Sequence, residues 1–153
     1  IRYLYIKNST ILFMNILFFF FCNSARSQIA EGLAKHMLGK EHNVRSAGSQ
    51  PSGFIHKNAI LALEEMGIDI SNNTSKSIEN LDNNFLNDLD FVITLCAEEI
   101  CPVLPSNAQS LHWKLEDPAN INFTDVEPIT PFLKTRDDLY KLLKKFTINY
   151  LIL

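Results

Sequence analysis

The sequence predicts an open α/β domain in which a parallel sheet carries helices on both of its faces. Short apolar runs at residues 16–21 and 89–96 are typical of strands that are buried on both sides. Segments with helical periodicity, at 27–38 and 56–67, alternate with these runs, and each is followed or closed by a glycine. Such alternation favours right-handed β–α–β crossovers, and therefore a doubly wound sheet.

The first unit is a strand, a polar turn and a helix. Residues 16–21 form the expected strand, and 22–26 are a short turn of mostly small or polar residues. The helix at 27–38 has apolar residues at helical spacing, and Gly39 follows as its stop signal.

The remaining elements follow from the same signals. A second strand is expected within 42–53, where it runs into a Gly/Ser/Pro loop, and a helix is expected at 56–67. Residues 89–96 form the third strand, and 110–118 form a fourth that breaks at Asp117-Pro118. An amphipathic helix at 131–146 closes the fold, and the Asn- and Ser-rich residues 71–88 are expected to be an irregular surface connection.

The chain, at 153 residues, has the length of one domain, which we assign to residues 14–147. Residues 1–13 are expected to be an extension without a role in the fold, and 148–153 an apolar C-terminal tail. Arg2 and Lys7 before an apolar run also match a signal peptide. Asn15 interrupts that run, and cleavage of a signal peptide would remove the strand from which the polar turn and its helix start. We therefore favour the cytoplasmic alternative.

Composition excludes several classes of function. The net charge is −3, and the densest basic cluster has the spacing of a solvated helix face, so no nucleic-acid surface is expected. The apolar run is too short to span a bilayer, so we expect no membrane association. Three cysteines without framework spacing suit a reducing compartment, and four scattered histidines offer no metal-site spacing. We therefore expect a cytoplasmic monomer without a bound metal.

The turn after the first strand is the strongest candidate for a site. Ligands of open α/β sheets bind beyond the carboxyl ends of the strands, where the turns converge. A polar turn that opens a helix gathers backbone N–H groups and the positive end of the helix dipole, which favour an oxyanion. Arg26 would add a guanidinium fork. Alternatively, Asn23, Ser24 and Ser27 only cap the helix, and Arg26 faces solvent.

Five ordered segments carry a resemblance to a known family: "NSARSQIAEGLAKH", "SAGSQPSG", "SKS", "VITLCAEEICPVLP" and "LHWKLEDPA". Together they resemble arsenate reductases of the low-molecular-weight tyrosine phosphatase superfamily. The resemblance implies a flavodoxin-like, open four-stranded parallel sheet. It also implies an oxyanion loop of pattern C-x5-R-S/T after the first strand, a general-acid Asp in a late Asp-Pro loop, and shuttle cysteines after the third strand.

Carried over by position, the resemblance assigns roles to particular residues. The oxyanion loop corresponds to Asn23, Ser24, Ala25, Arg26 and Ser27. Asp117 corresponds to the general acid, and Cys96 and Cys101 to the shuttle pair. The resemblance further implies an arsenate- or phosphate-type oxyanion as ligand, no bound cofactor, and thioredoxin or glutaredoxin as external reductant. From the residues alone, the two cysteines could equally be core filler, and Asp117 a turn former.

One position departs from the pattern. Six residues before Arg26, where the family has its nucleophilic cysteine, this chain has Phe20. Cys22 lies two residues later and is a weak substitute, because only three residues separate it from Arg26, too few amides to surround a tetrahedral anion. A two-residue slip of the strand would keep its faces in phase, so Cys22 stays open as an alternative.

These observations leave three functional hypotheses. The first is an arsenate reductase-like protein, of a lineage that reduces arsenate to arsenite with thiols, in which Phe20 impairs or abolishes the covalent step. The second is an oxyanion-binding or interaction module without turnover. The third is a low-molecular-weight protein tyrosine phosphatase, which the shuttle cysteines disfavour.

Overall fold

The computed structural model describes residues 2–6, 9–97, 101, 103–119 and 128–151, with side chains from residue 13 onward. Its centre is a four-stranded sheet in the order β4-β3-β5-β6. The strands are β3 (Asn15–Phe20), β4 (Asn43–Gly48), β5 (Phe91–Thr94) and β6 (Gln109–His112), and all neighbouring pairs are parallel. The predicted open parallel α/β sheet is thus confirmed. The fourth strand ends at His112, earlier than the expected 118.

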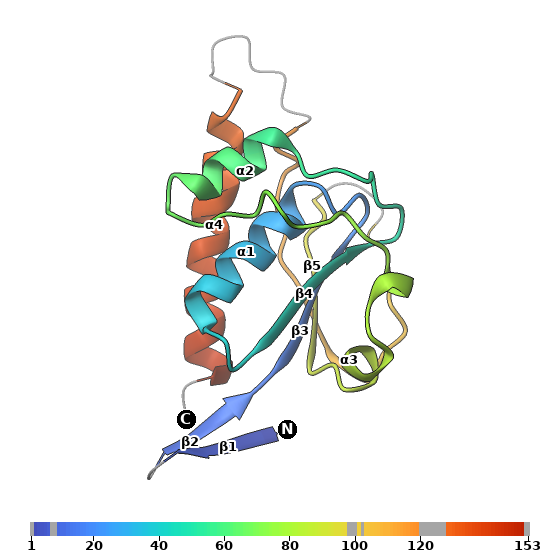
Figure 1. The fold of residues 1–153 in the computed structure, drawn as a ribbon, viewed down its shortest axis with the longest axis vertical. Helices are drawn as coiled ribbons and strands as arrows, with labels where there is room; N and C mark the ends of the chain where they lie inside the picture. The colour runs from blue at the N-terminus through green and yellow to red at the C-terminus, as the bar shows by residue number, and fades with distance from the viewer. Residues whose placement is uncertain (1, 7–8, 98–100, 102, 120–127, 152–153) are drawn as a thin grey trace.

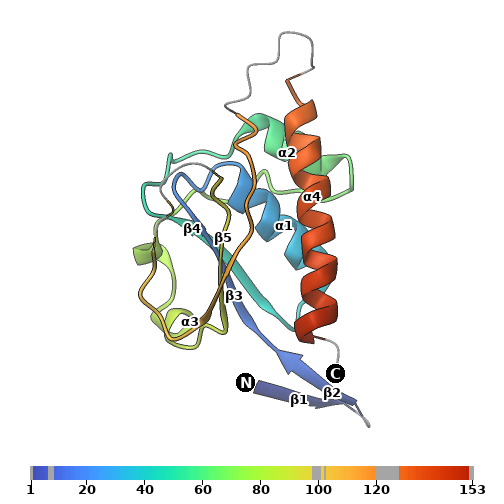
Figure 2. The same cartoon turned by 180° about the vertical axis from the view of Figure 1, so that it is seen from behind.

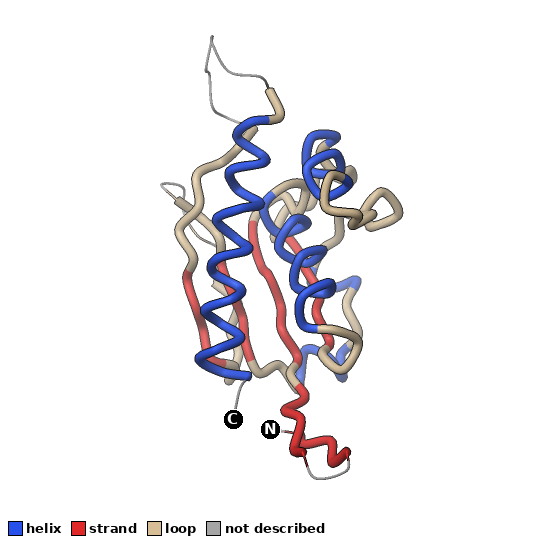
Figure 3. Tube along the Cα trace, turned by 90° about the vertical axis from the view of Figure 1, so that its left-hand side faces the viewer, coloured by secondary structure: helices blue, strands red, loops and turns tan. Residues whose placement is uncertain are grey.

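Helices cover both faces of this sheet, but unequally. On one face α1 (Arg26–Leu38) and α4 (Thr130–Phe146) lie side by side, with α2 (Lys57–Glu64) beside them (Figures 1 and 3). On the opposite face, the helical segments among the described residues are the 3₁₀ turn η1 (Ile78–Asn80) and the short α3 (Asn83–Asn87), and α3 can be found in the view from behind (Figure 2). The connection at 71–88, expected to be irregular, therefore contains two short helical segments.

The alternation of side chains along β3 explains the two layers. Ile16 and Phe18 point to the larger core, where they pack with residues such as Ile29, while Leu17 and Phe19 point to the smaller core under α3. All six residues of β3 are buried. A continuous apolar run is what a central strand covered on both sides requires.

The two ends of the chain lie outside this sheet. β1 (Arg2–Ile6) and β2 (Ser9–Phe13) pair as an antiparallel hairpin that forms a sheet of its own below the start of β3 (Figure 1). At the other end, η2 (Thr147–Leu151) continues α4 as a π-helical turn, and its Tyr150 packs on Phe91 and Phe146. Among the described residues, no helix has both the length and the apolar character that crossing a bilayer requires.

Because the four strands run parallel, their carboxyl ends share one edge of the sheet, opposite the hairpin (Figure 1). The turns after β3, β5 and β6 start from this edge. They contain Arg26, Cys96 and Asp117, respectively. The fold therefore gathers at one edge the candidate residues that the sequence places far apart.

Candidate functional site

The turn after β3 is braced along its length by the loop that follows β4. Three backbone hydrogen bonds of 2.9–3.0 Å join the two segments. The N–H groups of residues 49, 50 and 52 donate to the carbonyl oxygens of Phe20, Phe21 and Cys22, respectively. Gly48 allows this close approach, because a Cβ there would lie 2.4 Å from the Phe21 carbonyl oxygen. The turn is therefore held by backbone contacts as well as by its own side chains.

Asn23 is the main side-chain support of this turn. It is fully buried, and its backbone has a φ of 50°, a left-handed conformation that asparagine tolerates better than most residues. Its amide nitrogen donates to the hydroxyls of Ser27 and Ser46, both at 2.9 Å. Its amide oxygen accepts from Gln28 Nε2 and the Lys76 backbone N–H at 2.9 and 3.0 Å. The sequence interpretation of Asn23 as a possible helix cap missed this role: the side chain joins three segments of the chain.

Helix α1 begins directly after the turn, at Arg26. Its N-cap residue, Ala25, provides no side-chain hydrogen bond to the first turn of the helix. Ser27 is fully buried and Ser24 partly so. An N-terminus whose amides are not capped by a side chain keeps the partial positive charge that attracts anions.

Arg26 is buried and lies between the turn and the segment after β6. One guanidinium nitrogen, Nη1, donates to the Leu115 carbonyl oxygen at 2.9 Å, and Nη2 lies 3.8 Å from Asp117 Oδ2. Arg26 is only 4% exposed, so it does not face bulk solvent. The structure thus brings together Arg26 and Asp117, which are 91 positions apart in the sequence.

Phe20 lies directly beneath this arginine. The guanidinium carbon of Arg26 is 4.0 Å from the centre of the Phe20 ring, a cation–π contact, and Phe20 is 7% exposed. The position at the end of β3 where the sequence resemblance leads us to expect a thiol therefore holds an aromatic ring packed on the arginine. Cys22, the weak substitute, is a partly exposed free cysteine whose carbonyl oxygen also accepts from Ser75 Oγ at 3.0 Å.

A buried carboxylate lies behind the turn, and the sequence interpretation had not singled it out. Glu31 on α1 is 2% exposed and accepts a short hydrogen bond from Ser46 Oγ. Its oxygens lie 2.7 Å from Lys35 Nζ and 3.5 Å from Lys76 Nζ. Burial lowers the pKa of Lys76, and the negative charge of Glu31 acts in the opposite direction. This cluster connects α1 to β4 through the same Ser46 that contacts Asn23.

Cys96 and Cys101 form a disulfide after β5, with their Cα atoms 5.6 Å apart. Cys96 is buried and Cys101 is partly exposed. His112, the last residue of β6, places its Nδ1 atom 3.8 Å from Cys101 Sγ and 2.9 Å from Thr94 Oγ1. The sequence predicted the two cysteines as a pair but gave no signal for His112, because it comes from the neighbouring strand.

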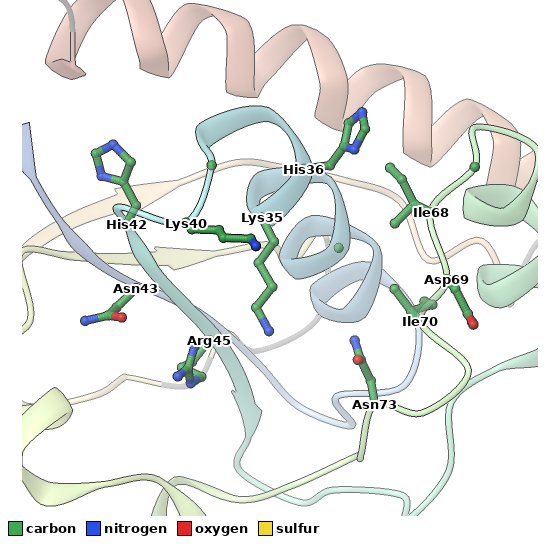
Figure 4. A pocket seen from close by; sticks show the side chains of 13 residues that line it. Lys35, His36, Lys40, His42, Asn43, Arg45, Ile68, Asp69, Ile70 and Asn73 are labelled. Carbon is green, nitrogen blue, oxygen red and sulfur yellow. The ribbon is translucent and has the colours of Figure 1, made fainter.

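A cavity of about 540 Å³ lies elsewhere, between the C-terminal part of α1, the start of β4 and the segment after α2. Figure 4 shows Lys35, Lys40 and Arg45 around it, with Asp69 on the opposite side. None of its lining residues belongs to the turn after β3. The cavity is therefore separate from the site built by Arg26, Asp117 and the disulfide.

The arrangement at the sheet edge has three parts. An uncapped helix start and a guanidinium can hold an oxyanion, and a carboxyl group beside them can exchange a proton with it. The disulfide can accept two electrons from an external dithiol. Phe20 supplies neither a nucleophile nor a charge.

Comparisons with known proteins agree with this geometry. Residues 15–149 match the family described as low molecular weight phosphotyrosine protein phosphatase. An arsenate reductase of Halalkalibacterium halodurans is 44% identical over 132 residues, which cover 84% of this chain and 92% of that protein.

Solved structures of similar proteins have the same fold. An arsenate reductase in a phosphate-binding state has a TM-score of 0.71 and 32% identity, over 88% of this chain and 97% of that one. A thioredoxin-dependent arsenate reductase of Corynebacterium glutamicum has a TM-score of 0.63 and 30% identity. The match covers 88% of this chain and 62% of that one. The chain belongs to the low molecular weight phosphotyrosine protein phosphatase family, and its relatives within that family include arsenate reductases.

Proposed function

We propose that this chain is an arsenate reductase-type protein in which the phenylalanine at position 20 blocks the first, covalent step. The observation that carries the proposal is the position of Arg26. Its guanidinium contacts the Phe20 ring on one side and lies near Asp117 on the other, at the sheet edge where the Cys96–Cys101 disulfide also starts. The turns that carry the other parts of the implied site all start from this one edge of the sheet.

Two facts favour a reductase over a phosphatase. A phosphatase of this family needs only the loop, its nucleophile and the acid, whereas thiol-dependent reduction also needs a pair of cysteines that can close a disulfide. Cys96 and Cys101 form such a bridge. Curated relatives that are 43% and 44% identical to this chain are also named arsenate reductases.

The proposed roles follow from the contacts. Arg26 and the amides of residues 23–27 would bind the oxyanion, and Asp117 would protonate the departing oxygen. With a cysteine at position 20, its thiolate would attack arsenic, and one oxygen would leave as water. Cys96 would then attack the sulfur of residue 20, so that a disulfide forms, the As–S electron pair stays on arsenic, and arsenite leaves. Finally, Cys101 would attack Cys96 to give the bridge seen here.

A thioredoxin-like protein is the proposed external reductant, with glutaredoxin as the alternative. The name of the Corynebacterium glutamicum relative states that it depends on thioredoxin. Two electrons from a dithiol would return the bridge to two thiols, and no prosthetic group is needed. We also propose that the chain is a monomer and that it is cytoplasmic, because a reducing compartment would keep the cysteine pair available as thiols.

The test is the gain of arsenate reduction by Phe20→Cys in a thioredoxin-coupled assay. Removing a catalytic nucleophile from a covalent enzyme costs on the order of 10⁶ in turnover, so restoring one should raise turnover by several orders of magnitude. Phe20→Ala is the matched control, because it opens the same space without adding a thiol. Losing the ring should cost stability in both variants, about 3 kcal/mol, so folding is checked by circular dichroism.

Each outcome decides between the hypotheses. Arsenate reduction by Phe20→Cys but not by Phe20→Ala supports the proposal. A folded Phe20→Cys protein that does not reduce arsenate contradicts the proposal. If the unaltered chain reduces arsenate and Cys22→Ser abolishes this activity, the nucleophile is Cys22, and the proposed block is contradicted. If the protein hydrolyses an aryl phosphate but does not reduce arsenate, it is a phosphatase.

The second candidate, an oxyanion-binding module, is favoured by one observation: the support of the loop by Asn23 does not involve the missing thiol. Phosphate binding by the unaltered chain, measured by calorimetry and lost in Arg26→Ala, would support it. If only Phe20→Ala binds phosphate, the ring itself blocks the anion.

A further inference from the structure

Three side chains with metal-binding atoms meet beyond β5 and β6. Cys96 Sγ, Cys101 Sγ and a ring nitrogen of His112 all lie within 4.8 Å of one another. Two of the residues follow β5, and the third is the last residue of β6. Parallel pairing sets Thr94 opposite His112, so the sheet register itself brings the imidazole to the cysteines.

We propose that, once the disulfide is reduced, Cys96, Cys101 and His112 form a binding site for Zn²⁺. Zinc prefers thiolate and imidazole ligands, and sites with three protein ligands leave the fourth position to water. The distance between Cys101 Sγ and His112 Nδ1 is 3.8 Å. Two ligands of a tetrahedral zinc ion, with Zn–S of about 2.3 Å and Zn–N of about 2.0 Å, are about 3.5 Å apart, so Cys101 and His112 need little movement. The two sulfur atoms are bonded in this structure. After reduction they must move apart to about 3.8 Å, the separation of two thiolates on one zinc ion.

The surroundings of His112 suit a ligand. Nδ1 lies 2.9 Å from Thr94 Oγ1, and the tautomer of the imidazole decides which of the two donates. In the tautomer with its hydrogen on Nε2, Nδ1 accepts from the hydroxyl with the lone pair that would bind a metal. The same hydroxyl lies 3.5 Å from the Leu111 carbonyl oxygen. When zinc occupies Nδ1, Thr94 can therefore donate to Leu111 instead.

The three ligands also combine anchoring with access. Cys96 is 1% exposed and is fixed by the core, while Cys101 is partly exposed and His112 is exposed. A metal ion can therefore enter from the solvent side. Two thiolates and a neutral imidazole carry a total charge of −2, which balances that of Zn²⁺.

Zinc and the disulfide exclude each other. An external dithiol supplies two electrons and two protons to the bridge and becomes a disulfide itself, which leaves two thiols. Zinc then replaces the two thiol protons, which pass to solvent. A bound ion would hold the pair reduced and withdraw it from electron transfer, so the site would link the redox state of this pair to zinc supply.

The test uses the full chain, reduced and then freed of reductant without oxygen. Co²⁺ replaces Zn²⁺ as a spectroscopic probe, because thiolate-bound Co²⁺ gives a charge-transfer absorption in the near ultraviolet. We expect one Co²⁺ per chain with this absorption, displaced by Zn²⁺. The oxidised form of the same chain should give none.

Variants assign the ligands. Cys96→Ser and Cys101→Ser should abolish the absorption. His112→Gln should weaken zinc binding at least about tenfold, since even partners outside the ligand shell contribute 10–100-fold. His36→Gln, on exposed helix surface, is the matched control and should bind as the unaltered chain does.

The proposal is overturned if the reduced chain gives no thiolate–cobalt absorption, or if Cys101→Ser or the oxidised chain gives the same absorption. Should Cys96→Ser fail to fold, Cys101→Ser and the oxidised chain still decide. The assay contains no arsenate, so its result is independent of the proposed reductase function.

Discussion

The turns after β3 and β5 start from the same edge of the sheet but have kept different parts of the implied site. The turn after β3 is supported by Asn23, which makes hydrogen bonds to α1, to β4 and to the backbone of Lys76. Where a nucleophile is expected, however, this turn has an aromatic ring. The turn after β5 has the expected cysteine pair, Cys96 and Cys101, joined as a disulfide. The comparison shows that the turn after β3 is supported by a buried amide without any thiol at position 20.

The largest expected effect is the loss of arsenate turnover when the turn after β5 lacks Cys96. In a Phe20→Cys background, Cys96→Ser should reduce thioredoxin-coupled arsenate turnover on the order of 10⁴ or more, because the thiol that is proposed to release arsenite is missing. The matched variant Ser106→Ala, on the exposed surface, should keep the rate of the background. Continued turnover without Cys96 would mean that the turn after β5 has no part in the reaction.

The next effect breaks the support of the turn after β3. Asn23→Ala leaves buried partners at Gln28, Ser46 and the Lys76 N–H without their hydrogen bonds, so the free energy of unfolding should fall by about 3 kcal/mol. Asn73→Ala is the matched control. It removes a single, longer contact of 3.4 Å and should cost less than about 1 kcal/mol. Equal losses in urea denaturation would show that Asn23 is not the main support.

A smaller effect tests the contact between the turn and β4. Gly48→Ala places a Cβ 2.4 Å from the Phe21 carbonyl oxygen, so the two segments must separate. We expect a loss of about 2 kcal/mol in the free energy of unfolding. Ser49→Ala, an exposed neighbour, should change stability by less than about 0.5 kcal/mol. A neutral Gly48→Ala would mean that the turn is not braced there.

How much of this could be predicted from the sequence differs between the same two regions. The four strands, the helix after the first turn and the pairing of Cys96 with Cys101 followed from apolar runs, stop signals and the family resemblance. The convergence of Arg26 and Asp117 followed from parallel topology, which sends both turns to one edge.

The rest depends on partners that a linear pattern does not show. Asn23 was recognised as a turn residue, but its bonds to Ser46 and Lys76 come from other segments. Glu31 occupies a helical position like any surface residue, and only the three-dimensional structure places Ser46 and Lys76 around it. The short α3 escaped notice because its sequence, rich in asparagine, lacks helical periodicity.

The smallest effect lies at the end of the sheet away from both turns. His42 Nδ1 accepts the Met14 N–H at 3.2 Å, and burial lowers the pKa of His42 below 6.5, while Glu41 acts in the opposite direction. Just below pH 6.5 the unfolded chain therefore binds more protons than the folded one, so stability should fall as the pH falls through this window. Urea denaturation between about pH 8 and about pH 5 measures the slope.

The matched variant for this slope is His42→Gln, which keeps an acceptor but does not titrate. It should have a flatter dependence of stability on pH than the unaltered chain. An unchanged slope would assign the pH dependence to other groups. The zinc affinity of the reduced chain should be the same in both proteins, since His42 lies at the opposite end of the sheet from the cysteine pair.

If position 20 alone separates this chain from a working reductase, as we propose, a single-turnover experiment with Phe20→Cys should show it. Reduced Phe20→Cys protein is mixed with arsenate in the absence of any other reductant. Arsenite and disulfide-linked peptides are then quantified. We expect one arsenite per chain together with a bridge between Cys96 and Cys101, and no arsenite from the unaltered chain. A folded variant that releases no arsenite, or that releases it without forming this bridge, would contradict the proposal.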